Sequence, residues 1–117
     1  MTHPARTFIQ AIACIALTAG AAQAQAQATP SAEREKQLVR MVRQDCGSCH
    51  GMHLTGGLGP ALTSQALDGK PLAYLSTVIT WGLPGTPMPA WQALLKEGEA
   101  DWIARQLAKG FPQEEKE

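Results

Sequence analysis

The chain has 117 residues, a mass of 12.5 kDa, and 10 basic residues against 10 acidic ones. This length fits one small domain, and the balanced charge without a long basic run argues against a nucleic-acid partner. The composition is otherwise that of a globular protein, apart from an alanine- and glutamine-rich N-terminal part.

That N-terminal part has the three-part pattern of a secretory signal peptide. A short polar start with Arg6 precedes the uncharged stretch TFIQAIACIALTAGAA, and small residues alternate in the AQAQAQA that follows. We expect cleavage after Ala24, Ala26 or Ala28, so that residues 1–24 are a leader and the mature protein is periplasmic. The alternative is an uncleaved membrane anchor, but the apolar stretch is shorter than the roughly 20 residues that a spanning helix needs.

Cleavage changes the composition of the mature chain. Loss of Arg6 leaves 9 basic residues against 10 acidic ones, and loss of Cys14 leaves Cys46 and Cys49 as the two cysteines. In an oxidising compartment such a pair forms a disulfide unless something else uses both sulfurs. The mature chain of about 90 residues buries only a marginal core by itself, so a large apolar cofactor would complete it.

Residues 31–46 form the first predicted helix of the mature chain. Acidic residues occupy its first turn, where they suit the helix dipole, and Leu38, Met41 and Val42 recur at helical spacing. This stripe is expected to face the core. The cations of the segment are expected to face water: Arg34, Lys36, Arg40 and Arg43.

Two further helices are predicted, over residues 71–82 and 97–110. Glycines break the long segment between the first and second helices, and three prolines stiffen the LPGTPMPAW loop before the last. No segment has a convincing strand pattern, so the predicted fold is all-α. We expect a domain over residues 29–112 and a charged tail over residues 113–117.

The segment DCGSCHG contains Cys46, Cys49 and His50 in a Cys-x-x-Cys-His motif. A thioredoxin-type redox pair needs a preceding strand, and a structural zinc site needs a second ligand pair. A disulfide over so short a loop would be strained. The motif therefore predicts covalent haem attachment, in which both thiols add to the vinyl groups of one haem and His50 binds the iron.

An electron-transfer haem also needs a sixth iron ligand, and Met88 is the candidate because methionine is the usual choice. Met88 lies in the proline-rich loop, whose stiff backbone keeps a weak ligand in place. Met41 belongs to the helix stripe, Met52 is too close to His50 to reach the other face, and His53 would need a large rearrangement.

The segment GGLGPAL places Pro60 ten residues after His50. An iron-ligating histidine normally donates its other ring N–H to a carbonyl, and the backbone carbonyl of Pro60 is the candidate acceptor. An ordinary turn is the alternative. Trp81 and Trp91 are candidates for lining the haem crevice with an indole N–H at a propionate, or else for core packing, as is Tyr74.

The segments DCGSCHG, GGLGPAL, GTPMPAW and EADWIARQL together resemble a class I cytochrome c over nearly all of the mature chain. The loops are most similar to the NirC (cytochrome c-55X) type of denitrification clusters. The resemblance implies three main helices around one covalent haem c with iron, the first and last crossing through Leu38, Val42, Trp102 and Ile103. The last helix departs from many relatives because it lacks a serine or threonine cap.

The resemblance also implies a one-electron carrier rather than an enzyme, with a periplasmic redox partner such as cytochrome cd1 nitrite reductase. We expect a monomer without membrane contact, docking through an apolar rim of Gly57, Leu58 and the LPGTP loop. An accessory role in haem d1 maturation stays open. A gas sensor would need Met88 to dissociate and a distal polar group, which only a moved His53 would supply. A peroxidase-like enzyme would need an open iron site with distal acid–base residues, of which so small a domain offers few.

Overall fold

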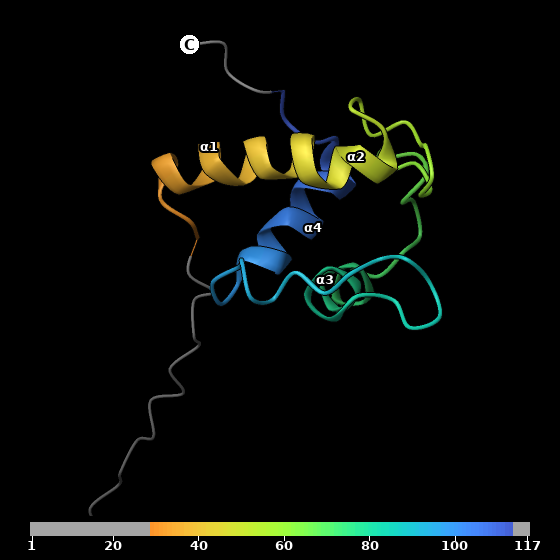
Figure 1. Ribbon diagram of the computed structural model, residues 1–117. Helices are drawn as coiled ribbons and strands as arrows, with labels where there is room; N and C mark the ends of the chain where they lie inside the picture. Colours follow the sequence, from red (N-terminus) through yellow and green to blue (C-terminus); the bar gives the residue numbers. More distant parts are fainter. Residues whose placement is uncertain (1–28, 114–117) are drawn as a thin grey trace, which may run out of the picture.

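The computed structural model describes residues 29–113, so the expected leader and most of the charged tail lie outside the described residues. Within residues 29–113 the fold is all-α and contains no strand, as predicted (Figure 1). No helix of this described part is long and apolar enough to span a membrane. The helical elements are α1 (Ala32–Met41), the π-helical turn η1 (Val42–Cys46), α2 (Gly47–His50), α3 (Leu72–Trp81) and α4 (Glu99–Lys109).

The first predicted helix extends beyond its expected end, because α1, η1 and α2 follow one another without a break as far as His50 (Figure 1). Ser31 caps the start, its hydroxyl accepting a hydrogen bond from the Arg34 backbone N–H at 3.3 Å. The end of this rod carries the Cys-x-x-Cys-His motif. A π turn is frequently found at a functional site, and this one directly precedes the motif.

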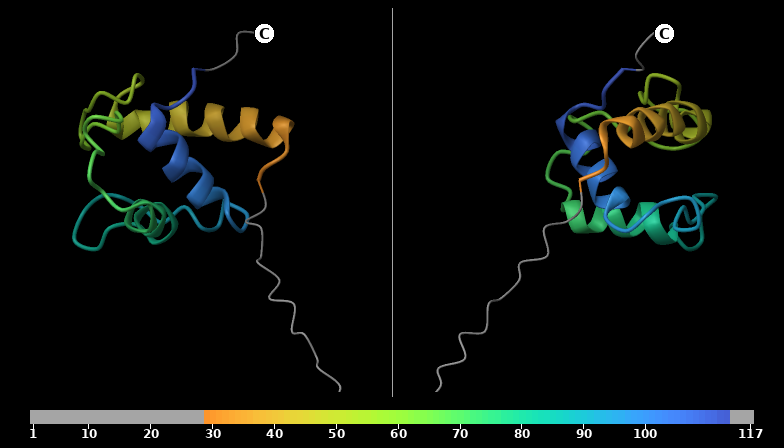
Figure 2. Two further views of the ribbon diagram at one scale, coloured as in Figure 1. Left: turned by 180° about the vertical axis from the view of Figure 1, so that it is seen from behind. Right: turned by 90° about the vertical axis from the view of Figure 1, so that its left-hand side faces the viewer.

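The core lies where α4 passes between α1 and α3 (Figures 1 and 2). The four residues expected at the crossing of the first and last helices are all buried in one cluster, which confirms their core position. The cluster consists of Leu38, Val39, Val42, Leu54, Leu67, Leu75, Trp102, Ile103, Ala104, Leu107 and Phe111.

Arg43 corrects the prediction for the first helix, because it is buried and does not face water. Its guanidinium donates hydrogen bonds to the carbonyl of Phe111 at 2.8 Å and to that of Pro112 at 2.7 and 3.0 Å. It also lies 5.5 Å from the centre of the Phe111 ring. Helical spacing could not reveal this contact, since the C-terminal segment folds back over η1 from a distance of nearly 70 residues in sequence.

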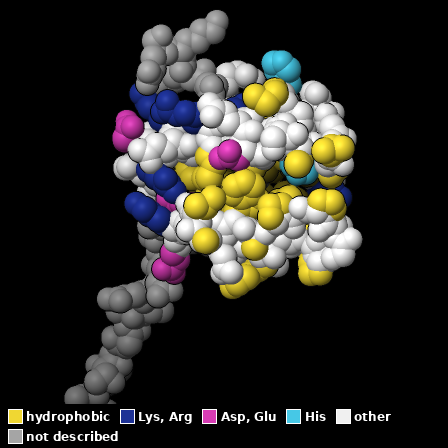
Figure 3. All heavy atoms as spheres, viewed as in Figure 1, with side chains coloured by type: hydrophobic (Ala, Val, Ile, Leu, Met, Phe, Trp, Pro, Cys, Tyr) yellow, Lys and Arg dark blue, Asp and Glu magenta, His cyan; other side chains and the backbone are white. Residues whose placement is uncertain are grey.

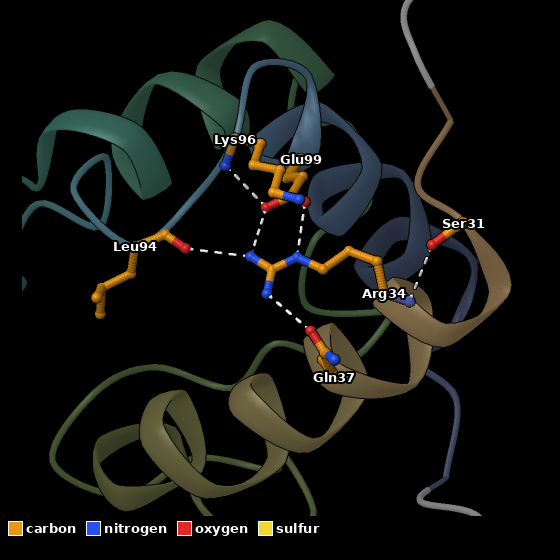
Figure 4. Close-up of polar contacts among 6 residues, drawn as sticks. All are labelled: Ser31, Arg34, Gln37, Leu94, Lys96 and Glu99. Atoms are coloured by element: carbon orange, nitrogen blue, oxygen red, sulfur yellow. Dashed lines mark hydrogen bonds and ion pairs between the residues drawn. The ribbon is translucent and has the colours of Figure 1, made fainter.

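The start of α4 is held by a buried carboxylate in place of the missing serine or threonine cap (Figure 4). The Glu99 carboxylate accepts hydrogen bonds from Nε and Nη2 of Arg34, both at 2.8 Å, and from the Lys96 backbone N–H at 2.8 Å. Arg34 also donates to the Leu94 carbonyl at 3.2 Å. Arg34, expected to face water, is therefore half-buried and joins α1 to the start of α4.

We expect Glu99→Gln to reduce the free energy of unfolding at neutral pH by about 1–2 kcal/mol, because the Arg34 hydrogen bonds lose their charged acceptor. Those hydrogen bonds lower the pKa of Glu99 from its ordinary 4.5. The carboxylate thus stabilises the fold fully above about pH 4.5, and this contribution is lost as the pH falls through the lowered pKa.

Urea unfolding of the holoprotein at neutral pH and at about pH 3 measures this dependence. The difference between the native protein and Glu99→Gln should narrow in acid. Glu97→Gln is the matched control, since Glu97 is exposed two residues earlier. A Glu99→Gln difference that persists unchanged in acid would contradict the assignment.

Candidate cofactor site

A cavity of about 840 Å³ opens on one face of the molecule, and its wall brings together residues that are far apart in the sequence. Cys46, Cys49, His50, Pro60 and Met88 all line it. Hydrophobic side chains gather around the hollow in Figure 3, whereas lysine and arginine side chains lie mainly at one side of this face. The size falls within the roughly 300–1,000 Å³ of small-molecule and cofactor sites.

His50 is buried at the end of α2, and its ring orientation is fixed. Its Nδ1 lies 2.7 Å from the backbone carbonyl of Pro60, which is the contact expected from the sequence. A carbonyl only accepts hydrogen bonds, so Nδ1 carries the proton and donates it. Nε2 therefore keeps its lone pair and is the nitrogen that can bind a metal.

Gly59 makes this approach possible, although its sequence pattern alone does not single it out. A Cβ at this position would lie 2.7 Å from Cε1 and 2.8 Å from Nδ1 of the His50 ring. The loop is held under the ring by two backbone hydrogen bonds of 2.8 Å, from Gly59 N–H to the Cys49 carbonyl and from Gly56 N–H to the His50 carbonyl. In the sequence, the glycine directly before Pro60 could have indicated that the backbone comes close to another group here.

We expect Gly59→Ala to displace the His50 ring and to destabilise the holoprotein by about 1–3 kcal/mol, as overpacking in a closed site does. The displaced ring should also weaken the His50–Pro60 hydrogen bond, which makes the imidazole a less basic ligand and therefore raises the reduction potential. Gly47→Ala is the control, because a Cβ there would meet nothing closer than 3.4 Å. Redox titration and thermal unfolding measure the two effects, and equal behaviour of both variants would contradict the steric argument.

Cys46 and Cys49 are free thiols, so the structure does not contain the alternative disulfide between them. Cys46 ends η1 and is half-buried, whereas Cys49 in α2 is exposed. Burial, together with the Asp45 carboxylate, raises the pKa of the Cys46 thiol to about 11, so this thiol is protonated at neutral pH. Residues 29–113 contain no group of three or more histidine, cysteine and acidic side chains placed to hold a metal ion.

Met88 reaches the cavity from the loop between α3 and α4. Its carbonyl accepts a hydrogen bond from Leu83 N–H at 3.2 Å, and Trp91 N–H donates to the Ile79 carbonyl at 3.1 Å. These bonds fasten both sides of the loop near the end of α3. Met41 also lines the cavity, but it belongs to the same helical rod as His50, whereas Met88 lies on a separate segment.

The other residues considered for the haem crevice differ in whether they line the cavity. Trp91 lines the cavity, whereas Trp81 is 62% exposed and lies neither in the cavity wall nor in the core. Tyr74 is likewise exposed and outside both. His53 is exposed and not part of the wall. Of the expected rim, Leu58 lines the cavity and is 94% exposed, and the LPGTP loop contributes Leu83, Thr86 and Pro87, whereas Gly57 is not part of the wall.

The donor set of this cavity fits a covalently attached haem. An apolar macrocycle needs an apolar wall, and this wall is formed mainly by leucine, isoleucine, valine, methionine and proline side chains. Two free thiols can form thioethers, an imidazole of fixed tautomer and a thioether sulfur can bind iron, and all four groups border the same space. An apolar cofactor in this cavity would complete the marginal core that is expected of so short a chain.

Comparisons with known proteins agree with this chemistry. Residues 19–105 match the family described as cytochrome c oxidase, cbb3-type, subunit III. The chain is 52% identical over 85 residues to cytochrome c55X of Stutzerimonas stutzeri, covering 73% of this chain and 75% of that protein.

Two solved structures are similar. The c-type cytochrome NirC matches with a TM-score of 0.67 and 51% identity, over 68% of this chain and 94% of its own. Dihydro-haem d1 dehydrogenase NirN in complex with DHE matches with a TM-score of 0.57 and 32% identity, over 66% of this chain and 17% of its own.

Proposed function

Because the chain belongs to the cytochrome c55X (NirC) family of monohaem c-type cytochromes, we propose that it carries single electrons in the periplasm to a cytochrome cd1 nitrite reductase during denitrification. Members of this family are electron carriers that bind haem c covalently. The observation that carries the proposal is that Cys46, Cys49, His50 and Met88 border one apolar cavity.

Each of these residues has a separate task in the proposal. Cys46 and Cys49 would hold the haem by thioether bonds, and His50 Nε2 and Met88 Sδ would bind its iron from two segments of the chain. The haem supplies an iron that takes up and releases one electron. Pro60 keeps the imidazole in one tautomer and orientation. With His50 and Met88 both available to hold the iron, the chain would leave no position there for a substrate, which suits a carrier and not a catalyst.

The residue pattern of the N-terminal segment supports export. We propose that residues 1–24 are the leader, that residues 29–112 form the cytochrome domain and that residues 113–117 form a tail. The leader pattern rests on a polar start, an uncharged apolar stretch and small residues at alternate positions. Export would also place the protein where a periplasmic nitrite reductase is found.

The rim of the cavity favours docking through apolar contact. Leu58 and Leu83 are exposed there, and Asp45 is the one acidic residue in the wall, which contains no lysine or arginine. Electron transfer through such a rim should depend weakly on salt, because few charges meet across it. Brief docking over a small apolar area is sufficient for a carrier.

We expect Leu58→Glu to slow electron transfer to the reductase by about tenfold, the factor that corresponds to 1.4 kcal/mol, because a carboxylate would be desolvated at the contact. Leu94→Glu is the matched control, since Leu94 is 61% exposed but does not line the cavity. Stopped-flow mixing of the reduced protein with oxidised cytochrome cd1 measures both rates. Equal slowing by the two variants would place the docking surface elsewhere.

The function is tested with the full chain expressed in a host that matures c-type cytochromes. A pyridine-treated sample reports thioether-linked haem, and mixing with oxidised cytochrome cd1 reports electron delivery at low and high salt. Fast reduction of the reductase supports the proposal. Covalent haem without electron transfer to this partner would overturn the choice of partner, and absence of covalent haem would overturn the carrier function.

A role in haem d1 maturation is the second candidate, and the likeness to dihydro-haem d1 dehydrogenase favours it. A cytochrome segment similar to this chain forms 17% of that protein. The separate chain could therefore accept electrons released when a haem d1 precursor is oxidised. Reduction of the oxidised protein during turnover of such a dehydrogenase, at a rate exceeding delivery to cytochrome cd1, would favour this role.

A further inference from the structure

The loop that carries Met88 begins as a closed ring of hydrogen bonds. The Leu83 N–H donates to the Met88 carbonyl at 3.2 Å, so the two ends of this segment lie together, and the Thr86 N–H donates to the Leu83 carbonyl at 3.1 Å. Pro84 and Gly85 lie between the partners of the second bond, and Gly85 has a φ of 79°. Proline followed by glycine in the left-handed region is the pattern of a type II turn, so the sequence itself sets this chain reversal.

The Thr86 side chain joins the two ends of the ring. Its hydroxyl donates to the Leu83 carbonyl at 2.7 Å and accepts from the Met88 N–H at 3.3 Å. The hydroxyl proton is therefore used inside the loop, and the oxygen binds the backbone of the residue that presents the sulfur. Although Thr86 borders the cavity, its hydroxyl is directed at the loop backbone.

The neighbouring prolines make Met88 depend on this hydroxyl. Pro87 and Pro89 flank Met88 and have no N–H, so they add no backbone donor of their own. The Met88 backbone is held at two points, its carbonyl by Leu83 and its N–H by Thr86. A residue before a proline is confined to extended backbone, which applies to both Thr86 and Met88. With few torsions left free, the hydroxyl fixes the point from which the Met88 side chain starts.

We propose that Thr86 is a positioning residue for the iron ligand, because its hydroxyl holds the Met88 backbone where the thioether stays on the oxidised iron. The inference rests on the proposed function, in which Met88 is the sixth ligand, and adds the group that limits loss of this ligand. The oxidised state matters because a thioether favours reduced iron. Gly82 leaves room for the arrangement, since a Cβ there would lie 2.7 Å from the Met88 carbonyl oxygen.

The experiment measures how tightly imidazole binds the oxidised holoprotein in place of the Met88 sulfur. Thr86→Val keeps the shape of the side chain but removes both hydroxyl bonds. We expect imidazole to bind this variant about tenfold more tightly than the native protein, as the loss of two modest hydrogen bonds allows. Thr86→Ser keeps the hydroxyl and should restore the native affinity.

Thr77→Val is the matched control for this series. The Thr77 hydroxyl also donates to a backbone carbonyl at 2.7 Å, that of Ala73, but it is exposed on α3 and outside the cavity wall. This variant should bind imidazole as the native protein does. Urea unfolding of the same samples measures general loosening of the fold, which would raise the imidazole affinity of both valine variants alike.

Amide hydrogen exchange of the reduced native holoprotein gives a second measurement, which decides the matter even if Thr86→Val does not accumulate. The Met88 N–H should exchange about tenfold more slowly than the Gly85 N–H after correction for intrinsic rates. Both lie in the same loop, but the Gly85 N–H has no acceptor among the described residues.

Three results would overturn the inference: equal imidazole affinities for Thr86→Val and Thr77→Val, a Thr86→Ser variant that behaves like Thr86→Val, or equal exchange of the two N–H groups. The oxidised native spectrum is recorded first. If it lacks the methionine-to-iron charge-transfer band, the proposed ligand set fails and Thr86 has no ligand to position. If the band is present, a failure of the series concerns Thr86 alone.

Discussion

Met88→Ala is expected to let carbon monoxide bind the reduced protein and to lower the reduction potential by tenths of a volt, within the ~0.8 V range that axial ligands span. In the native protein, carbon monoxide can replace the Met88 sulfur only if the loop moves. Hydrogen bonds near the end of α3 hold that loop in place. Truncation removes the sulfur while the loop backbone stays in place. A thioether favours the reduced state, so its loss lowers the potential.

Two other methionines serve as controls for this result. Met52 is 59% exposed and outside the cavity wall, so Met52→Ala should leave carbon monoxide excluded and the potential unchanged. Met41 lines the cavity and is the alternative sulfur, so Met41→Leu tests it directly while keeping similar volume. Optical spectra of the oxidised and reduced proteins, with and without carbon monoxide, report each case.

The outcomes distinguish the functions as well as the ligand. If the native protein ignores carbon monoxide and Met88→Ala binds it, Met88 is the sixth ligand and the carrier function is supported. If the native protein already binds carbon monoxide, the site is open and gas binding becomes the better interpretation. If Met41→Leu alone opens the site, the ligand assignment is wrong although the cavity is correct.

The sequence predicted those features of the molecule that are encoded by residues close together in the chain. The Cys-x-x-Cys-His motif predicts its chemistry within five residues, and the His50–Pro60 contact is also predictable because the intervening loop is short and rich in glycine. The helices follow from the helical spacing of apolar residues, and α3 and α4 lie within the two ranges that this spacing predicted. These features need little knowledge of the rest of the fold.

The features that sequence reasoning missed are contacts between distant segments. Glu99 looks like an ordinary acidic residue of a first helical turn, yet Arg34 from the other end of the domain makes it a buried anion. Trp81 and Trp91 are equivalent candidates from spacing, and only the folding of the loop against α3 leaves Trp91 half-buried in the cavity wall and Trp81 exposed. Composition and periodicity contain no information about such partners.

Arg43→Met should lower the free energy of unfolding by about 2–4 kcal/mol, the range for losing hydrogen bonds from a buried charged group. The carbonyls of Phe111 and Pro112 would lose three hydrogen bonds, and Phe111 would lose the cation above its ring. Methionine keeps much of the side-chain volume, so a cavity contributes little to the change.

The structural consequence reaches the cofactor site, because Arg43 lies in the π turn that ends at Cys46. Arg40→Met, an exposed position one turn earlier on the same rod, is the control and should change stability by no more than about 0.5 kcal/mol. Arg43→Lys should be intermediate, since it keeps the charge but not the planar fork that reaches both carbonyls. Chemical unfolding of the haem-loaded proteins measures the series. If Arg43→Met and Arg40→Met proved equally stable, the C-terminal segment would not be anchored through this side chain, and the π turn would owe its position to the buried cluster alone.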